Sequence, residues 1–199
     1  MTAADWSDRY ATTPESDLSW FEEQPATSLE LIGTAATNAS VIDVGCGESH
    51  LVDCLLERGY RDIAVLDISQ TALTNVHERV GDAPVTWIQA DIRDWTPDRT
   101  FDVWHDRAAY HFLIEHDEQQ HYWDRVRTTL EPGGRVVIAT FADDGPETCS
   151  GVPVIRYDER QLTQALGDGF IVTTTRREQH PTPTGGHQSF LWLVAERDE

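Results

Sequence analysis

The segment VIDVGCG at residues 41–47 constrains the fold of this chain more than any other feature. A short apolar run ends in Asp43, a turn containing Gly45 and Gly47 follows, and a helical pattern begins after it. Glycine has no Cβ, so the backbone of such a turn can approach a ligand closely, and the next helix N-terminus adds hydrogen-bond donors. The segment therefore predicts a strand–turn–helix unit that binds a ligand in an α/β fold.

Short apolar runs alternate with helical patterns along the rest of the chain, which indicates a parallel sheet covered by helices on both faces. Strands are expected at residues 40–44, 62–67, 85–89, 101–105, 135–140, 170–175 and 189–195. Helices are expected at 48–58, 69–81, 117–130 and 158–166, the second capped by Ser69 and the last by an Asp158/Gln161 capping box. No helix separates the last two strands, so these should pair antiparallel. The predicted fold is α/β: a doubly wound, mostly parallel seven-stranded sheet with an antiparallel last strand, in a three-layer α/β/α sandwich.

The length of 199 residues suits one domain. Residues 1–35 are aromatic and polar, with Pro25 placed to open a short helix, and we expect them to form a lid or arm. Residues 36–199 then form the ligand-binding domain on which this arm packs.

The charge balance limits the partners of the chain. It has 35 acidic and 15 basic residues, a formal net charge of −20, and every basic residue is Arg. Such a surface repels phosphate backbones and anionic lipids, so neither nucleic acid nor a membrane is an expected partner. It suits a high-salt cytoplasm, where salt screens the self-repulsion. No secretory signal or membrane-length apolar run is visible, and three cysteines without CxxC spacing predict neither a disulfide framework nor a metal site.

Three acids indicate which ligand the glycine turn serves. Asp43, Asp67 and Asp91 end three successive predicted strands, so their side chains should meet at one crevice. A dinucleotide fingerprint would have a third glycine where this chain has His50, and a phosphate-binding P-loop would need a Lys that the chain lacks. Each acid could singly be a turn residue or a helix cap, but together they predict a cofactor site.

The order of four motifs resembles the class I, seven-strand S-adenosylmethionine-dependent methyltransferases. These motifs are VIDVGCG, VLDIS, ADIRD and EPGGRVVIAT. The resemblance implies that S-adenosylmethionine is the cofactor: the glycine turn contacts its methionine part, the second-strand acid its ribose, and the third motif its adenine. The implied cofactor-binding residues are Asp43, Gly45, Cys46, Gly47, Asp67, Ile68, Asp91 and Ile92.

A narrower resemblance concerns the segments WSDRY, DLSWFEEQPATSLELI and FDVWHDRAAYHFL. They are similar to a small group related to the lysine methyltransferases of citrate synthase and translation elongation factors. His105 and Arg107 depart from the more usual residues of that group, and relatives without an assigned substrate share the pattern. The methyl acceptor therefore stays open between a small molecule and a protein lysine, and the assembly between a monomer and a homodimer.

The acceptor is expected in a cleft bounded by the N-terminal arm, residues 104–112 and residues 141–154, because the cofactor would point its methyl group there. Proximity and orientation can carry much of a methyl transfer, so a dedicated base is optional. The candidate bases are His105, Asp106 and His111, although Asp106 could instead pair with Arg107 and His111 could be packed. The residues expected on the substrate side are Trp20, Arg107, Tyr110 and Phe141.

Two other functions compete with a methyltransferase. The first is an NAD(P)-binding oxidoreductase, which the missing third glycine opposes. The second is a protein that binds S-adenosylmethionine without catalysis. Intact cofactor motifs would be present in such a protein as well as in an enzyme, so they do not distinguish the two.

Overall fold

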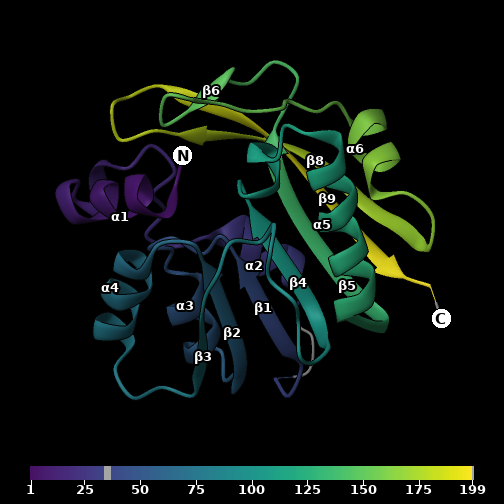
Figure 1. Ribbon diagram of the computed structural model, residues 1–199, viewed down its shortest axis with the longest axis horizontal. Helices are drawn as coiled ribbons and strands as arrows, with labels where there is room; N and C mark the ends of the chain where they lie inside the picture. Colours follow the sequence, from purple (N-terminus) through teal and green to yellow (C-terminus); the bar gives the residue numbers. More distant parts are fainter. Residues whose placement is uncertain (34–36, 199) are drawn as a thin grey trace.

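A seven-stranded sheet forms the centre of the protein, in a computed structural model that describes residues 1–33 and 37–198. Its strands are β1 Ser40–Val44, β2 Asp62–Asp67, β3 Val85–Gln89, β4 Phe101–Arg107, β5 Leu130–Phe141, β8 Phe170–Pro181 and β9 His187–Arg197. Their order is β3-β2-β1-β4-β5-β9-β8 (Figure 1), and β9 runs antiparallel to both of its neighbours. The chain leaves β1 toward β2 on one side and returns to β4 on the other, so a crevice opens between β1 and β4. The predicted doubly wound sheet is confirmed.

Helices cover both faces of this sheet and complete the three predicted layers. One apolar core lies under α2 Ala26–Ile32, α3 Leu51–Glu57 and α4 Gln70–Val80. The other core lies under α5 His116–Thr129 and α6 Glu159–Leu166, which stand in front of the sheet in Figure 1. Across the described residues, no helix combines the length and apolar character that crossing a bilayer would require.

Local capping explains where several helices begin. The Ser69 hydroxyl accepts a hydrogen bond from the Ala72 N–H at 3.2 Å, as predicted for the start of α4. Asp158 and Gln161 form the predicted capping box of α6. A second capping box, at Thr2, starts α1 Ala3–Thr12, a helix that the sequence analysis left unassigned.

The structure moves several predicted boundaries. Strand β4 runs on to Arg107, and α3 begins only at Leu51 because the preceding residues form the turn. Helix α5 passes directly into β5 at Leu130, so residues 131–134, which lie between the predicted helix and the predicted strand, belong to β5 and bulge out of its pairing with β4. Between β5 and α6, where no strand or helix was predicted, the chain forms a small hairpin of β6 Thr148–Cys149 and β7 Val152–Pro153.

The N-terminal segment divides into two parts. Helix α1 packs against α4, where the hydroxyls of Ser7 and Ser69 lie 3.0 Å apart, and a 3-10 turn η1 spans Glu15–Asp17. Helix α2 instead buries Leu29 and Ile32 in the core beneath the sheet, so it is a layer of the fold and not part of a cover. The predicted arm boundary at residue 35 falls outside the described residues.

Candidate functional site

One cleft lies at the carboxyl ends of the central strands, between the glycine turn and the N-terminal segment. We call it the strand-end cleft. Every residue predicted to bind cofactor lines it: Asp43, Gly45, Cys46, Gly47, Asp67, Ile68, Asp91 and Ile92. Of the residues predicted on the acceptor side, the cleft includes Trp20, His105, Arg107 and Phe141, and leaves out Asp106, Tyr110 and His111.

The glycine turn is shaped by contacts that exclude any larger side chain. The Gly45 N–H donates to the carbonyl of Leu66 at 2.7 Å, which joins the ends of β1 and β2. Gly45 and Gly47 both have positive φ angles, 67° and 52°. A Cβ added to Gly45 would lie 2.4 Å from the Cβ of Ala109, and one on Gly47 would lie 2.6 Å from the hydroxyl of Tyr10. The bare turn therefore faces the cleft with its backbone.

Asp67 at the end of β2 is held by backbone donors on both sides. Its Oδ2 accepts from the Gly47 N–H at 2.8 Å, and its Oδ1 accepts from the Ser69 N–H at 2.8 Å. Burial raises the pKa of this carboxyl to about 6 against the effect of these hydrogen bonds. Each carboxylate oxygen keeps a further lone pair, so an ionised Asp67 can accept from two hydroxyl groups of a ligand.

Asp91 lies at the far end of the strand-end cleft and is engaged by a neighbour. Arg93 donates to both of its carboxylate oxygens, from Nε at 2.9 Å and from Nη2 at 2.5 Å. Although burial opposes it, this pairing lowers the pKa of Asp91. The carboxylate is therefore anchored, and Ile92 next to it adds an apolar wall.

His105 connects Asp43 to the helix layer beneath the sheet. Its Nδ1 lies 2.7 Å from Oδ1 of Asp43, and its Nε2 lies 3.0 Å from the hydroxyl of Ser28 in α2. Both ring nitrogens are thus bonded to buried partners. Nothing in the sequence pattern singled out Ser28.

Asp106 does not face the strand-end cleft, which corrects the prediction that it acts on the acceptor. Its carboxylate accepts from the N–H groups of Ala109 and Tyr110, at 2.9 and 3.1 Å, and from the hydroxyl of Tyr122 at 2.6 Å. Burial raises its pKa to about 6. Successive side chains of a strand point to opposite faces, so Asp106 turns toward α5 while His105 turns toward α2. It shapes the turn after β4.

Tyr110 and His111 also lie outside the strand-end cleft, although both were predicted on its acceptor side. The Tyr110 hydroxyl accepts from the Trp123 indole at 2.9 Å, inside the core under α5. His111 is buried, and its Nδ1 accepts from the N–H of Phe141 at 3.3 Å. Desolvation lowers the pKa of His111 to about 3, so the ring is neutral at physiological pH. Of the two roles that the sequence left open for His111, a base or a packed residue, the structure shows the packed residue.

Aromatic rings form the other end of the strand-end cleft, which we call the aromatic half. Its rings belong to Trp6, Trp20, Phe112, Phe141 and Phe190. The Trp6 ring meets Trp20 and Phe112 edge to face, with centroids 6.1 and 5.4 Å apart, and Phe141 meets Phe190 at 5.0 Å. The carboxylates among the described lining residues belong to Asp43, Asp67 and Asp91 at the strand ends, so the aromatic half contributes none.

Arg107 fastens the N-terminal segment over the aromatic half. Its Nη1 donates to the carbonyl of Trp20 at 2.9 Å, and its Nη2 lies 3.6 Å from the carboxylate of Glu22. The guanidinium also lies over the Phe190 ring, 5.0 Å from its centre. His180 of β8 lies 3.0 Å from the carbonyl of Ser19 through Nε2. We call residues 19–22 the strap.

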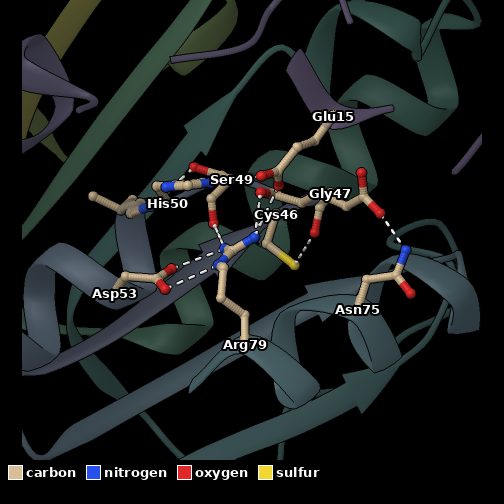
Figure 2. A network of polar contacts seen from close by, with 10 residues as sticks. Glu15, Cys46, Gly47, Ser49, His50, Asp53, Asn75 and Arg79 are labelled. Carbon is tan, nitrogen blue, oxygen red and sulfur yellow. Dashed lines mark hydrogen bonds and ion pairs between the residues drawn. The ribbon is translucent and has the colours of Figure 1, made fainter. Parts of the chain in front are cut away.

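A second arginine, Arg79 of α4, anchors the loop after the glycine turn (Figure 2). It donates to both oxygens of Asp53 at 2.9 and 2.8 Å, and to the carbonyls of Glu48 and Ser49 at 3.2 and 2.8 Å. Its fifth hydrogen bond, 3.1 Å long, reaches the carboxylate of Glu15 in the N-terminal segment. All five donors of the guanidinium are therefore used, and one residue joins α3, α4, the turn and the arm. We call Arg79 and these partners the Arg79 hub, and no feature of the sequence predicted it.

The two cysteines of the strand-end cleft are buried thiols. Burial raises the pKa of Cys149 to about 11 and that of Cys46 well above its ordinary value. Both are free cysteines, and both are protonated at neutral pH. Cys149 therefore contributes apolar wall, and reactive thiolate chemistry is disfavoured there.

Comparison with known sequences agrees with the motif order. Residues 41–134 match the family model described as "Methyltransferase domain". An uncharacterized methyltransferase of Mycobacterium tuberculosis is 30% identical over 144 residues, which cover 72% of this chain and 66% of that protein. The cypemycin N-terminal methyltransferase of a Streptomyces species is 30% identical over 69% of this chain and 54% of its own length. The chain thus spans just under two thirds, or less, of these curated relatives.

Solved structures reproduce the whole fold. The N-methyltransferase NodS of Bradyrhizobium japonicum, in complex with S-adenosyl-L-homocysteine, has a TM-score of 0.79 at 16% identity and covers all of both chains. The 1,6-didemethyltoxoflavin N1-methyltransferase of Burkholderia thailandensis has a TM-score of 0.76 at 21% identity, covering 99% of this chain and 87% of that one. At these identities the likeness concerns the fold.

Residues 41–134 form a methyltransferase domain by sequence, and the sheet order and glycine turn give the chain the fold of the class I S-adenosylmethionine-dependent methyltransferases. Within that class it is similar to the uncharacterized mycobacterial methyltransferase at 30% identity. The eEF1A lysine and N-terminal methyltransferase of Mus musculus is 25% identical over 62% of this chain and 20% of its own length. The narrower resemblance to elongation-factor enzymes is therefore only weakly supported.

Proposed function

We propose that this protein transfers a methyl group from S-adenosylmethionine to a small, flat acceptor molecule held in the aromatic half of the strand-end cleft. The observation that carries the proposal is the continuity of one cleft. The glycine turn and three carboxylates line one end, and aromatic rings line the other. A cofactor and an acceptor would thus lie end to end in a single cavity.

The residues at the strand ends fit the cofactor chemically. Gly45 and Gly47 line the cleft without side chains, so a ligand can approach the backbone of the turn closely. Asp67 has free lone pairs for the two ribose hydroxyls, and Asp43 offers a carboxylate to the methionine ammonium. When bound, S-adenosylmethionine would supply an electrophilic methyl group.

The chain's own contribution to the chemistry would be orientation and exclusion of water. Among the described residues that line the cleft, no side chain near the aromatic half is placed as a base, because both ring nitrogens of His105 are bonded and the thiol of Cys149 is protonated. The acceptor must therefore present a lone pair of its own. Holding that lone pair in line with the methyl group can supply most of the rate enhancement.

The lining of the aromatic half favours a small molecule over a protein lysine. A carboxylate would stabilise the ammonium group of a lysine side chain, and the described residues that line the aromatic half contribute none. Arg107 would suit an acceptor that carries a carbonyl or carboxylate oxygen, once the strap moves. A neighbour with the same fold, the Burkholderia thailandensis N1-methyltransferase, was solved with bound 1,6-didemethyltoxoflavin, which supports a small-molecule acceptor.

The proposal is tested by labelled methyl transfer from S-adenosylmethionine in a lysate of the source organism, separated into metabolites and macromolecules. We expect label in the metabolite fraction with the purified protein, and much less with an Asp67→Ala variant at the same limiting cofactor concentration. Label found only in protein would overturn the acceptor assignment. Calorimetry that detects NADH binding and no S-adenosyl-L-homocysteine binding would revive the oxidoreductase alternative.

A further inference from the structure

Asp43 and His105 are direct partners in the pairing of two parallel strands. Position 43 of β1 lies opposite position 105 of β4, and the two side chains point to the same face of the sheet. Ser28 reaches them from α2, which covers that face. The three residues form a line in which only 3%, 2% and 1% of Asp43, His105 and Ser28 is exposed.

The chemistry of the partners assigns the protons in this line. An ionised carboxylate can only accept, so the bond of 2.7 Å to Asp43 requires a proton on Nδ1 of His105. The ring nitrogen on the other side, Nε2, then meets the Ser28 hydroxyl at 3.0 Å. Neither nitrogen is left to take a proton from an acceptor in the cleft.

The carboxylate of Asp43 depends on this single partner. Among the residues that the structure describes, His105 provides the only hydrogen bond to it. A buried carboxylate with no donor is strongly disfavoured, so without this partner the side chain would rotate or admit water. The ring of His105 is itself fixed, because Ser28 holds its far side and Trp192 packs against it with centroids 6.3 Å apart.

We propose that His105 is a positioning residue, which holds the Asp43 carboxylate in place at the strand-end cleft that it lines, and that Ser28 fixes the ring in that orientation. This inference rests on the proposed function only in that Asp43 receives the ammonium group of the cofactor. It replaces the earlier expectation that His105 is a base. The departure of position 105 from the usual pattern thus acquires a role in cofactor binding.

The variants His105→Ala, His105→Asn and Ser28→Ala test the proposal by calorimetry with S-adenosyl-L-homocysteine. His105→Ala should weaken binding by about tenfold to a hundredfold, because it removes the donor from a buried carboxylate. His105→Asn places an amide N–H near the position of Nδ1 and should recover most of the affinity. In Ser28→Ala, His105 keeps its hydrogen bond to Asp43, so this variant should bind S-adenosyl-L-homocysteine about as tightly as the His105→Asn variant does.

Turnover at saturating cofactor distinguishes positioning from proton transfer. We expect kcat of His105→Ala to stay within about threefold of the original protein, since the loss is in cofactor binding. A large fall in kcat with unchanged cofactor affinity would overturn the proposal and restore His105 as a base. Equal loss of affinity in the Ala and Asn variants would also contradict it.

A spectroscopic measurement keeps the proposal testable if the alanine variant fails to fold. Long-range ¹H–¹⁵N spectra of the original protein report which ring nitrogen of His105 carries a proton. We expect a protonated Nδ1, and a ring protonated at Nε2 alone would overturn the assignment. This readout needs no cofactor, so it separates failure of this inference from failure of the proposed function, which absence of S-adenosyl-L-homocysteine binding would reveal.

Discussion

The carboxylate of Asp67 accepts the N–H of Gly47 at 2.8 Å, which ties the turn after the first strand to the end of the second. This bond places an acidic group beside a backbone that has no side chain. The glycine turn follows β1 and Asp67 ends β2, and these neighbouring parallel strands end at the same edge of the sheet. The two motifs therefore form one binding site together. It also makes Asp67 the residue whose loss should affect the cofactor most directly.

Replacing Asp67 with Ala should weaken binding of S-adenosyl-L-homocysteine by about 1–3 kcal/mol, the cost of leaving ligand hydroxyls and the Gly47 N–H without an acceptor. Titration calorimetry on the folded variant measures this loss. Asp91→Ala is the matched control, because Arg93 already engages that carboxylate and a smaller loss is expected. Unchanged affinity of the Asp67 variant would refute the assignment to ribose.

Cofactor affinity should fall when the pH is lowered through about 6. Burial raises the pKa of Asp67 to about 6, and the ionised form is the one that can accept hydrogen bonds at both oxygens. A ligand that donates to this carboxylate prefers its ionised form, so binding is strong above pH 6 and weakens below it. Calorimetry across this range should show the dependence, and an Asp67→Asn variant should lack the inflection.

Removing Arg107 should loosen the strap and affect the acceptor more than the cofactor. The Arg107→Ala variant loses the bond to the Trp20 carbonyl and the contact with Glu22. We expect a higher KM for the acceptor, with S-adenosyl-L-homocysteine affinity within about twofold of the original. Arg176→Ala, which breaks an exposed ion pair with Glu30, should change neither quantity. If both arginine variants behave alike, the strap has no part in acceptor binding.

The Arg79 hub should contribute more to stability than an ordinary surface ion pair. Arg79→Ala leaves two backbone carbonyls and the partly buried Asp53 without donors. We expect the free energy of unfolding to fall by about 1–3 kcal/mol, against less than about 0.5 kcal/mol for Arg176→Ala. Denaturant titration of both variants provides the comparison, and equal values would show that the hub adds nothing.

We propose that the acidic surface is an adaptation to high salt inside the cell, and a stability measurement checks it. With a formal net charge of −20, self-repulsion destabilises the compact state in dilute buffer, and salt screens it. The melting temperature should therefore rise from dilute buffer to molar KCl, by about 2–4 °C for each kcal/mol gained. A temperature that stays level or falls would argue for an ordinary acidic protein.

The local sequence determined the elements and the cofactor end of the site. Apolar periodicity and caps such as Ser69 are properties of a few neighbouring residues, so strands, helices and the turn at Gly45 could be predicted. Acids that follow strands were expected at one edge because parallel strands end together. The lining of the strand-end cleft includes Asp43, Asp67 and Asp91 as expected.

Only the tertiary structure decided which residues meet at the acceptor end. Asp106 and His105 are neighbours in the chain, yet the strand turns them to opposite faces, and only His105 reaches the cleft. Ser28 and Phe190 join the site from distant parts of the sequence through helix and sheet packing. Local propensity carries no information about such contacts. They depend on how the helices and the sheet stack, and on which side chains that stacking buries.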